Sequence, residues 1–512
     1  MFSTVLSATL HGLCVDFVHV EADTSNGLPM FHMVGYLSSE VKEAGERVRT
    51  AIRNTGLNLP AKKIVVNLSP ANIRKRGTMF DLPIAVAILV SLGEISSRFL
   101  ENTLIVGELS LDGAVKDVPG ILPIVMEAKK KGCKICIVPK ENEKEGALVD
   151  EIQVIGVKSL KEVCMILNGK KNVTPQKREN YPTCMLEESG LDYSDIKGQK
   201  LAKRAVEIAV AGNHNILMIG PPGVGKSMIA KRIPTILPPL TLEESMELTR
   251  IYSIVGGLDK ESPLVCKRPF REVHHSVTRS ALIGGGGVPK PGEISLSHKG
   301  VLFLDEIAEF QKYVLEALRQ PLESHRIKIL RERGEYDFPA EFLLVAAMNP
   351  CPCGNYPDLN KCTCATPQIK KYLGRLSQPF LDRIDLCVEV ERVQYQDLCD
   401  TEQPETSKEI QARVLKAREI QRKRYQGIDI STNAQLGAKE MKKYCQLGNK
   451  EEQVMRNAFE SMGMSARSYY KVLGVARTIA DLEGTAEIRM YHLKEALGYR
   501  MIDKKYWGRT KI

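Results

Sequence analysis

Three short apolar runs in the middle of the chain each lead directly into residues suited to chemistry. Residues 216–219 precede a glycine-rich turn, 301–304 precede two acids, and 342–348 precede an asparagine. Strands that are buried on both faces of a parallel sheet read as continuous apolar runs rather than as an alternation. The pattern therefore predicts strands of a buried parallel sheet, with polar side chains placed where the strands end.

The regions on either side have different patterns. The beginning of the chain alternates short apolar strands with two helical patterns, "SSEVKEAGERVRTAI" and "PIVMEAKKKG". A polar, lysine-rich stretch punctuated by proline then predicts a linker. We therefore divide the chain into an N-terminal domain (1–168), a linker (169–190), a core (191–395) and a helical C-terminal domain (396–512).

The C-terminal domain begins with "SKEIQARVLKAREIQRKRY", a basic amphipathic helix. Its residues Ile410, Val414 and Ala417 recur on one face, which predicts that the helix packs as a lid over the core. We expect its basic end, residues 422–424, to be a solvated face.

Length and composition agree with several folded domains. A chain of 512 residues is too long for one core, and 43% hydrophobic with 26% charged residues is close to the globular average. The start has no basic opening and reaches Asp16 early, and the apolar run "FDLPIAVAILVSL" is shorter than the ~18 residues of a membrane span. We expect a cytoplasmic protein with no membrane partner. The net charge of +10 permits a polyanionic partner without requiring one.

The glycine-rich turn "GPPGVGKS" has the spacing of a P-loop. Its backbone N–H groups can surround phosphates, its lysine can reach the β and γ phosphates, and its serine hydroxyl can bind Mg²⁺. ATP and Mg²⁺ are therefore the expected cofactors. The predicted nucleotide-binding residues are Gly220, Pro221, Pro222, Gly223, Val224, Gly225, Lys226 and Ser227.

The two acids after the second apolar run complete a hydrolytic centre. We expect Asp305 to hold Mg²⁺ and Glu306 to polarise the attacking water. Two surface acids at a strand end are the alternative.

Longer stretches of the chain resemble a known family. The ordered matches include "GLPMFHMVGYLSSEVKEAGERVRTAI", "VNLSPANIRKRGTMFDLPIA", "HHSVTRSALIGGGGVPKPGEISLSHKGVLFLDE", "NPCPCG", "RLSQPFLDRIDL" and "SARSYYKVLGVARTIADL". On these residues the chain is similar to the YifB/ComM family of magnesium-chelatase-like AAA+ ATPases. The resemblance implies an α/β fold: an AAA+ P-loop core with a parallel sheet sandwiched by helices, an N-terminal Lon-protease-like α+β domain and a C-terminal helical lid.

The resemblance also implies roles for single residues. Asn349, at the tip of its strand, matches the first sensor, which helps to position the attacking water. Arg467 matches the second sensor, with Arg477 as the alternative, and Ile196 in "DIKGQ" matches the neighbourhood of adenine.

A shared active site is implied as well. The arginine finger, which reaches the γ phosphate of the neighbouring subunit, falls on Arg383, with Arg375 as the alternative and a structural salt bridge as the other interpretation of either. The family assembles as a homo-hexamer, and its ComM branch is implied to drive branch migration of DNA in homologous recombination during natural transformation.

Four cysteines follow Asn349 as two Cys-x-Cys pairs, within a loop at 349–364. Four thiolates can close a tetrahedral shell on Zn²⁺, and such a closed site is structural. Free buried thiols or a labile disulfide are the alternatives. The predicted zinc ligands are Cys351, Cys353, Cys362 and Cys364.

The N-terminal domain resembles the Lon protease domain without its catalytic residues. The family's serine falls near Met79 and its lysine near Leu122, so a Ser-Lys mechanism has neither nucleophile nor base. We expect the domain to serve as a scaffold or a binding module.

Two core segments are candidates for the central pore. The resemblance makes the four glycines at 284–287 part of a flexible pore insertion, and "HRIKILRERGEYDFPAEFLLV" predicts a hairpin with Arg331 and Arg333 near its turn. Basic pore loops would hold phosphates without reading bases, so DNA would be bound independently of sequence. Solvated loop charges are the alternative.

Three functions share these motifs: a DNA-translocating motor or helicase, the motor subunit of a magnesium chelatase, and an ATP-dependent protease or protein-remodelling enzyme. The missing Ser-Lys pair argues against proteolysis. The chelatase motor lacks a Lon-like domain in front of its core, so we favour the DNA motor.

Overall fold

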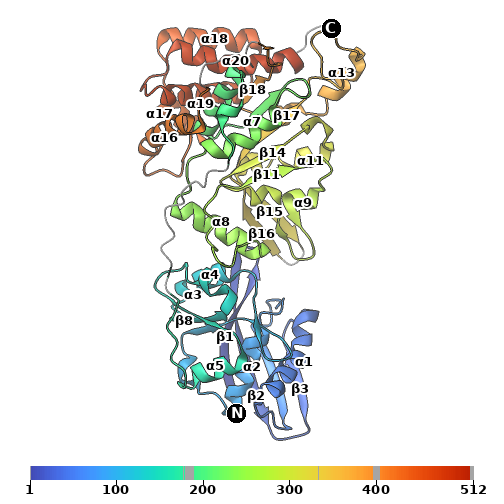
Figure 1. Ribbon diagram of the computed structural model, residues 1–512, viewed down its shortest axis with the longest axis vertical. Helices are drawn as coiled ribbons and strands as arrows, with labels where there is room; N and C mark the ends of the chain where they lie inside the picture. Colours follow the sequence, from blue (N-terminus) through green and yellow to red (C-terminus); the bar gives the residue numbers. More distant parts are fainter. Residues whose placement is uncertain (1, 177, 179–189, 332–333, 396–403, 508–512) are drawn as a thin grey trace. The chain divides into compact units, whose positions relative to one another are not determined.

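The computed structural model describes residues 2–176, 178, 190–331, 334–395 and 404–507 (Figure 1). Within these residues, no helix is both long enough and apolar enough to cross a membrane. The chain forms two compact units. The first comprises Met1–Thr183, Thr241–Cys266 and Leu330–Phe338, and the second comprises Cys184–Leu240, Lys267–Ile329 and Pro339–Ile512. Residues 177 and 179–189 of the predicted linker lie outside the described residues.

The first unit contains a seven-stranded mixed sheet in the order β3-β4-β2-β1-β5-β8-β9. Its longest strands form the antiparallel pair β1–β2. Its strands are β1 (Phe2–His11), β2 (Cys14–Ser25), β3 (Met30–Val34), β4 (Lys63–Ser69), β5 (Thr103–Ile105), β8 (Ile135–Pro139) and β9 (Gln153–Val157), with β6 (Glu108–Leu109) and β7 (Val115–Lys116) as a separate pair. Its helices are α1 (Ser39–Asn54), α2 (Asp81–Ser91), α3 (Ile121–Lys130), α4 (Glu143–Gly146), α5 (Leu160–Leu167) and α8 (Leu242–Val255).

Helix α2 lies in the core of the first unit, and every one of its residues is buried. It contains the apolar run that is too short for a membrane span. The predicted pair of helices, α1 and α3, is present, but α2 has no polar face and therefore gives no helical period in the sequence. The one charged side chain of α2, Asp81, accepts two hydrogen bonds from Arg47, at 2.8 and 2.9 Å. This paired geometry stabilises a buried carboxylate.

The positions expected for a protease dyad are apolar and buried. Met79 is 6% exposed and Leu122 is fully buried. The backbone N–H of Leu122 donates to Glu145 Oε1 at 2.8 Å, and the Ser253 hydroxyl donates to the same oxygen at 2.5 Å. Burial raises the pKa of Glu145, and these two hydrogen bonds lower it by a smaller amount. The carboxylate therefore caps the N-terminus of α3 and ties α8 to it.

Two segments from the middle of the sequence belong to the first unit. In α8, the Ser253 carbonyl accepts a hydrogen bond from the Gly120 N–H at 3.1 Å. In the hairpin tip, the Tyr336 ring stacks on His11 with centroids 4.1 Å apart and planes at 15°. Arg331 is exposed in the same tip, and Arg333 lies outside the described residues. The predicted hairpin is confirmed as the two-stranded sheet β15–β16.

The second unit is built on a five-stranded sheet in the order β11-β14-β17-β10-β18, in which every neighbouring pair is parallel. Strands β10, β14 and β17 are wholly buried, as their apolar runs predict. The strands are β10 (Ile216–Ile219), β11 (Phe270–Val273), β14 (Val301–Leu304), β17 (Leu343–Met348) and β18 (Leu386–Glu389), and the short pairs are β12 (Gly284–Gly285) with β13 (Lys290–Pro291) and β15 (Arg326–Arg331) with β16 (Gly334–Pro339), whose tip lies in the first unit.

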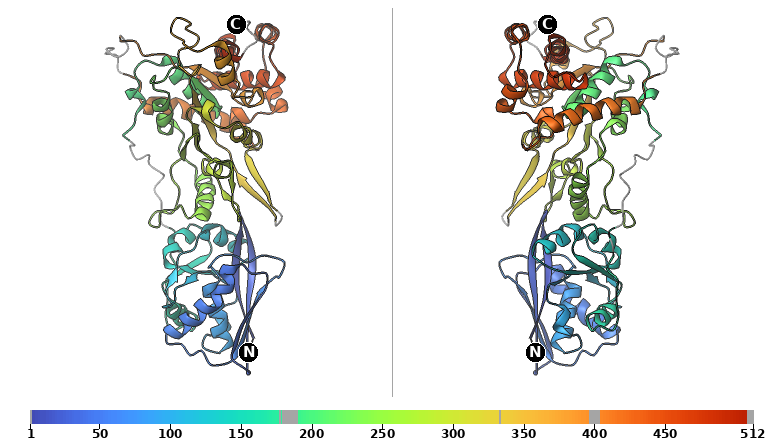
Figure 2. Two further views of the ribbon diagram at one scale, coloured as in Figure 1. Left: turned by 90° about the vertical axis from the view of Figure 1, so that its right-hand side faces the viewer. Right: turned by 90° about the vertical axis from the view of Figure 1, so that its left-hand side faces the viewer.

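Helices pack around this sheet, and those nearest the C-terminus gather together in the views of Figure 2. Helix α6 contacts β10 and β18, and α20 contacts β18. The helices of this unit are α6 (Lys200–Gly212), α7 (Lys226–Arg232), α9 (Arg279–Ile283), α10 (Glu293–Leu296), α11 (Lys312–Ala317), α12 (Pro321–Ser324), α13 (Thr366–Leu373), α14 (Gln378–Leu381), α16 (Ser407–Arg424), α17 (Ala438–Tyr444), α18 (Asn449–Met462), α19 (Ala466–Leu482) and α20 (Met490–Trp507).

The first half of the glycine run belongs to a strand pair, and Gly286 and Gly287 lie in the turn that joins the two strands. Gly284 and Gly285 pair with Lys290 and Pro291 in β12–β13. Gly284 has φ of 107°, and a Cβ there would lie 2.4 Å from the Lys290 carbonyl oxygen. Close approach of two backbones therefore explains the glycine better than flexibility does.

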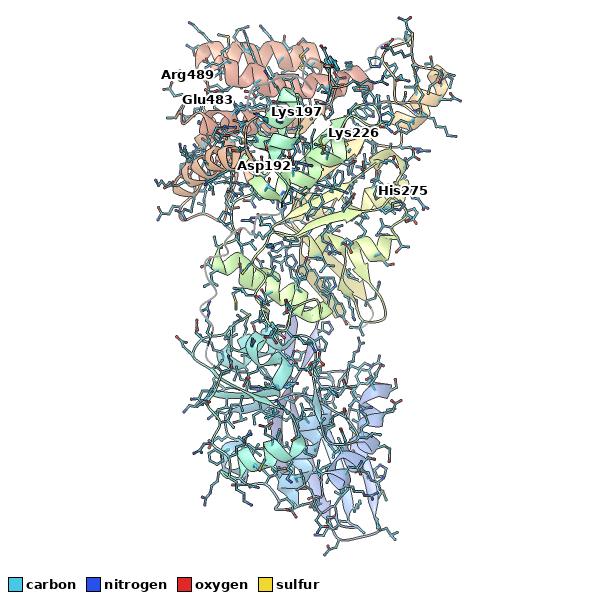
Figure 3. All side chains as sticks on the ribbon, in the orientation of Figure 1. Asp192, Lys197, Lys226, His275, Glu483 and Arg489 are labelled. Atoms are coloured by element: carbon cyan, nitrogen blue, oxygen red, sulfur yellow. The ribbon has the colours of Figure 1, made fainter. Side chains whose placement is uncertain are left out.

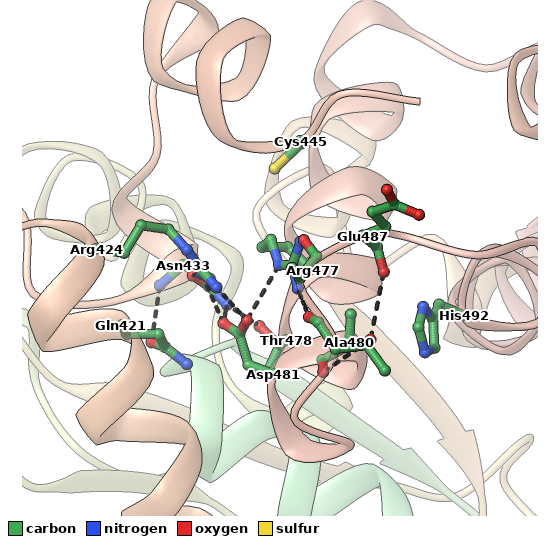
Figure 4. Close-up of polar contacts among 12 residues, drawn as sticks. Gln421, Arg424, Asn433, Cys445, Arg477, Thr478, Ala480, Asp481, Glu487 and His492 are labelled. Carbon is green, nitrogen blue, oxygen red and sulfur yellow. Dashed lines mark hydrogen bonds and ion pairs between the residues drawn. The ribbon is translucent and has the colours of Figure 1, made fainter. Parts of the chain in front are cut away.

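A buried polar network joins the C-terminal helices (Figure 4). Asp481 on α19 pairs with Arg424 of α16 and with Arg477, the latter at 3.1 Å, and accepts from Asn433 at 2.9 Å. The side chain of Arg477 is 2% exposed and that of Arg424 is 15% exposed. The expectation that residues 422–424 form a solvated face is therefore wrong for Arg424, because Asp481 draws its guanidinium inward. The apolar face of α16 is buried as predicted.

Candidate nucleotide-binding site and cysteine cluster

Three predicted site segments meet at the carboxyl edge of the parallel sheet. The P-loop follows β10, Asp305 and Glu306 follow β14, and Asn349 follows β17. These three strands are neighbours in the order β14-β17-β10, so their carboxyl ends lie side by side. Open parallel sheets bind ligands at this edge.

Lys226 lies at the centre of this edge. Its ammonium group donates to the carbonyls of Gly220 and Pro221, at 2.7 and 2.8 Å, and to Asn349 Oδ1 at 3.0 Å. Burial lowers the pKa of Lys226 to about 8, although the nearby carboxylates of Asp305 and Glu306 act to raise it. The predicted phosphate lysine and first sensor are therefore in direct contact.

The predicted magnesium ligands also touch. The Ser227 hydroxyl donates to Asp305 Oδ2 at 2.6 Å, and Asp305 Oδ1 accepts from the backbone N–H of Glu306 at 2.9 Å. Glu306 is exposed and has φ of 48°. Non-glycine residues adopt this left-handed conformation rarely, and such residues cluster at functional sites. The hydroxyl and carboxylate oxygens offered here are the ligands that Mg²⁺ prefers.

Close packing fixes the P-loop in place. A Cβ at Gly220 would lie 2.2 Å from the carbonyl oxygen of Val390, and a Cβ at Gly354 would lie 2.4 Å from Pro222 Cδ. The first contact explains why the loop opens on glycine. The second shows that the cysteine loop packs directly on the P-loop.

Ile196, matched to the neighbourhood of adenine, is 3% exposed and belongs to the core of the second unit. The nearby Gln199 side chain donates to the carbonyl of Glu391 at 2.6 Å and to that of Val224 at 3.4 Å. The segment therefore lies against the P-loop, and the adenine contact of Ile196 stays a prediction.

The four predicted zinc ligands form one cluster. Cys351 Sγ lies 3.4 Å from Cys353 Sγ and 3.8 Å from Cys362 Sγ, and Cys353 Sγ lies 3.6 Å from Cys362 Sγ. The fourth thiol, that of Cys364, completes the cluster, and all four sulfurs lie within 4.8 Å of one another. A zinc ion with four bonds of about 2.3 Å separates its sulfurs by about 3.8 Å. The cluster therefore could hold a zinc ion without a large movement of the loop.

Backbone N–H groups point at two thiols of this cluster. The Tyr356 N–H points at Cys351 Sγ at 3.4 Å. Burial raises the pKa of the Cys353 thiol, but hydrogen bonds from the Asn355 and Thr363 backbone and from the Cys351 and Cys364 thiols lower it more, to about 5. The pKa values of Cys362 and Cys364 are raised instead, by burial and by the other thiols. Such second-shell donors are typical of thiolate metal sites.

The predicted finger lies at the opposite edge of the sheet. Arg383 precedes β18, and its carbonyl accepts from Asn215, which precedes β10, at 3.1 Å. The four residues of β10 separate Asn215 from Gly220, and five steps along a strand cover roughly 16 Å. The Arg383 guanidinium, 8% exposed, pairs with Glu323 at 2.7 Å. Arg383 therefore cannot join the P-loop of its own chain.

The other arginines are divided between the two edges. Arg467, 61% exposed, also pairs with Glu323, at 3.0 Å. Arg375 pairs with Glu309 at 2.6 Å and donates to the Ala308 carbonyl, in the turn that follows Glu306. Arg477 donates to the carbonyls of two loop residues and to Asp481, so a buried structural role accounts for its contacts.

Sequence reasoning missed two groups of residues near these edges. His274 and His275 follow β11, which pairs in register with β14, so they stand beside the strand that leads into Asp305. Figure 3 labels His275. The adjacent pair of histidines was the available signal. Glu323 had no local signal, because its partners lie far away in the sequence.

Models of related families match most of the chain. A model described as magnesium chelatase, subunit ChlI, matches residues 192–398, and one for the C-terminal part of that subunit matches 404–500. A third, described as subunit ChlI of Mg-chelatase, matches 20–142. These matches place both units in a magnesium-chelatase-like class.

Relatives extend the match to nearly full length. Competence protein ComM of Haemophilus influenzae is 43% identical over 500 residues, covering 97% of each chain. The chain belongs to the YifB/ComM family of magnesium-chelatase-like AAA+ proteins. YifB of Escherichia coli is 43% identical over 488 residues, covering 95% of this chain and 94% of YifB. Lon protease 2 of Bacillus subtilis is 32% identical over 127 residues, which are 24% of this chain and 22% of the protease. The Lon-like similarity is therefore partial.

Proposed function

We propose that this member of the YifB/ComM family hydrolyses ATP. The observation that carries the proposal is the meeting of Lys226, Ser227, Asp305 and Asn349 at one edge of the sheet. Lys226 would exchange its carbonyl partners for phosphate oxygens, Ser227 and Asp305 would hold Mg²⁺, and Glu306 would polarise the attacking water. The bound Mg²⁺ would supply charge neutralisation on the phosphates.

The active site is proposed to be completed by a second copy of the chain. The placement of Arg383 supports this, because it lies across the sheet from its own P-loop. A ring, proposed to be a homo-hexamer, would bring Arg383 of one copy to the ATP of the next. Mixing Arg383→Ala chains with Lys226→Ala chains should restore activity, since some interfaces then join an intact P-loop to an intact finger. Absence of rescue, with both variants still assembling, would contradict the ring.

The proposed substrate of this motor is branched DNA. The similarity to a competence protein supports DNA as the partner, and the net charge of +10 is compatible with it. The exposed Arg331 at the hairpin tip would hold phosphates without reading bases. Pulling one arm of a junction through the ring breaks base pairs ahead and reforms them behind, so little net energy is needed. We propose ATP-driven branch migration during recombination.

One side-by-side measurement tests the proposal. ATPase rates are compared without DNA, with single strands, with duplex and with a four-way junction, together with movement of the junction itself. We expect stimulation by the junction, binding that falls steeply with salt, and ATP-dependent migration that is lost in Lys226→Ala and weakened in Arg331→Ala. An assembled, ATP-hydrolysing protein that neither binds DNA at low salt nor moves a junction would contradict the DNA motor.

A protein partner is the alternative. The family model over residues 20–142 itself carries the name of a chelatase subunit, so the N-terminal domain does not separate the two functions as the sequence reasoning assumed. The alternative predicts ATPase activity that is indifferent to DNA and stimulated by a protein substrate.

A further inference from the structure

Glu323 joins two arginines that the sequence assigns to different roles. Arg383 Nη2 lies 2.7 Å from Glu323 Oε1, and Arg467 Nη2 lies 3.0 Å from the same oxygen. The three residues come from α12, the turn before β18 and the first turn of α19. One carboxylate oxygen therefore bridges two guanidinium groups that are distant in the sequence.

This bridge brings two like charges close together. Two nitrogens that each contact the same oxygen lie within about 6 Å of one another, where guanidinium groups repel. The negative charge of Glu323 offsets that repulsion. Without it, the more loosely held arginine would move away.

The two arginines are held unequally. Arg383 is 8% exposed and also donates to the carbonyls of Arg319, at 3.1 Å, and Pro379. Arg467 is 61% exposed, and within the described part of the chain Glu323 is the acid with which its guanidinium pairs. Arg383 is therefore anchored by the fold, whereas Arg467 depends on Glu323.

All three side chains line one cavity. Its volume is about 290 Å³, and its lining also includes Lys471 and Asp385, which pair with each other at 2.6 Å. Glu323 itself is 47% exposed, so an incoming anion could compete with it for the two arginines. The cavity lies at the edge of the sheet opposite the P-loop, where Asn215, one of its lining residues, precedes β10.

We propose that Glu323 is a positioning residue that holds Arg467 beside Arg383, so that both guanidinium groups meet the terminal phosphate of ATP bound by a neighbouring copy. The inference rests on the proposed ATPase ring. In the assembled ring, phosphate oxygens replace the carboxylate between the two arginines. Glu323 thereby keeps the pair together while no phosphate is present.

The first test separates this role from general stability. Glu323→Gln keeps the size of the side chain but removes its charge, and it should lower kcat about tenfold with little change in nucleotide affinity, because the P-loop is untouched. Adding Arg467→Ala to Glu323→Gln should cost little more than Arg467→Ala alone, since both act through one contact. Glu419→Gln, which breaks an exposed ion pair with Lys423 on α16, is the matched control and should behave as wild type.

The second test asks where Glu323 acts. In an equal mixture of Glu323→Gln and Lys226→Ala chains, about a quarter of the interfaces join an intact P-loop to an intact arginine pair. Activity per chain should rise two- to threefold, roughly, above that of Glu323→Gln alone. A role confined to the chain that carries Glu323 predicts that dilution instead halves the activity, roughly.

The outcomes separate the two proposals. If mixing rescues Arg383→Ala but Glu323→Gln is as active as wild type, or is inactive without rescue, the positioning role is overturned and the ATPase ring stands. If the wild type hydrolyses no ATP, or Arg383→Ala is not rescued, both proposals fall. Should Glu323→Gln not fold, Glu323→Asp keeps the charge on a shorter side chain, and the same rescue by mixing is required of it.

Discussion

The two edges of the parallel sheet in the second unit differ in how their residues are assembled. At the carboxyl edge, residues adjacent in sequence form the site, since Lys226 and Ser227 are neighbours, as are Asp305 and Glu306. At the amino edge, Glu323 forms ion pairs with two arginines that come from separate elements. The comparison teaches that the carboxyl edge gathers the residues of the proposed nucleotide site from short local motifs, whereas the amino edge gathers two arginines that are distant in the sequence.

Removing the lysine at the carboxyl edge should have the largest effect. Lys226→Ala should abolish nucleotide binding and hydrolysis, because it removes the ammonium group that would reach the phosphates. Glu306→Gln should still bind ATP but turn over at least ~100-fold more slowly, because the group that polarises water is lost. Nucleotide binding and steady-state hydrolysis measure both effects. Near-normal turnover in Glu306→Gln would show that Glu306 does not polarise the attacking water.

The arginines offer a sharper contrast between the edges. Arg383→Ala should lower kcat about a hundredfold and be rescued by Lys226→Ala chains. Arg375→Ala should have a smaller effect and should not be rescued, because Arg375 braces the turn after Glu306 in its own chain. Hydrolysis at several mixing ratios measures this difference. If Arg375→Ala were rescued and Arg383→Ala were not, Arg375 would be the arginine finger and Arg383 would act within its own chain.

The cysteine loop tests how far the carboxyl edge depends on its neighbours. Protein purified without chelator should contain about one Zn²⁺ per chain, lost when Cys351 and Cys353 become serine. Because Gly354 packs on Pro222, loss of metal should weaken nucleotide binding severalfold. Metal analysis and nucleotide titration provide the readouts. Cys133, a free cysteine in the core of the first unit, lies outside the cluster, so Cys133→Ser serves as the control. Metal-free protein that is folded and fully active would overturn the zinc site.

A further prediction concerns pH. The lowered pKa of Lys226, about 8, means that the side chain is charged below this pH and loses its proton above it. Nucleotide affinity of the free enzyme should therefore fall as pH rises past 8, by up to about tenfold per pH unit. Titration with a fluorescent nucleotide between pH 6.5 and 9.5, roughly, would show it. An affinity independent of pH would indicate that water shields the lysine more than its burial implies.

Local patterns account for what the sequence could predict. The P-loop, the two acids and the cysteine pairs are short motifs whose spacing fixes their geometry, and β10, β14 and β17 are buried as their apolar runs indicate. The predicted domain boundaries rest on composition alone and stay a prediction.

Long-range packing accounts for what the sequence could not predict. Helix α2 was not predicted, because a helix that is buried on all sides shows no helical alternation of apolar and polar residues. Arg424 and Arg477 look like surface residues in the sequence, yet Asp481 draws both inward. Glu323 and its two arginines meet only in the folded chain.

The two core segments that belong to the first unit have a consequence for how the protein can be divided. Helix α8 and the hairpin tip belong in sequence to the predicted core, residues 191–395, but Ser253 bonds to Gly120 and Glu145, and Tyr336 stacks on His11. Deleting residues 1–168 would therefore remove the residues that α8 and Tyr336 contact, and would expose the surfaces of both to solvent. The N-terminal domain therefore cannot be removed or exchanged as an independent domain. Aggregation of a shortened chain would result from these lost contacts and would not show that an activity of the N-terminal domain is missing.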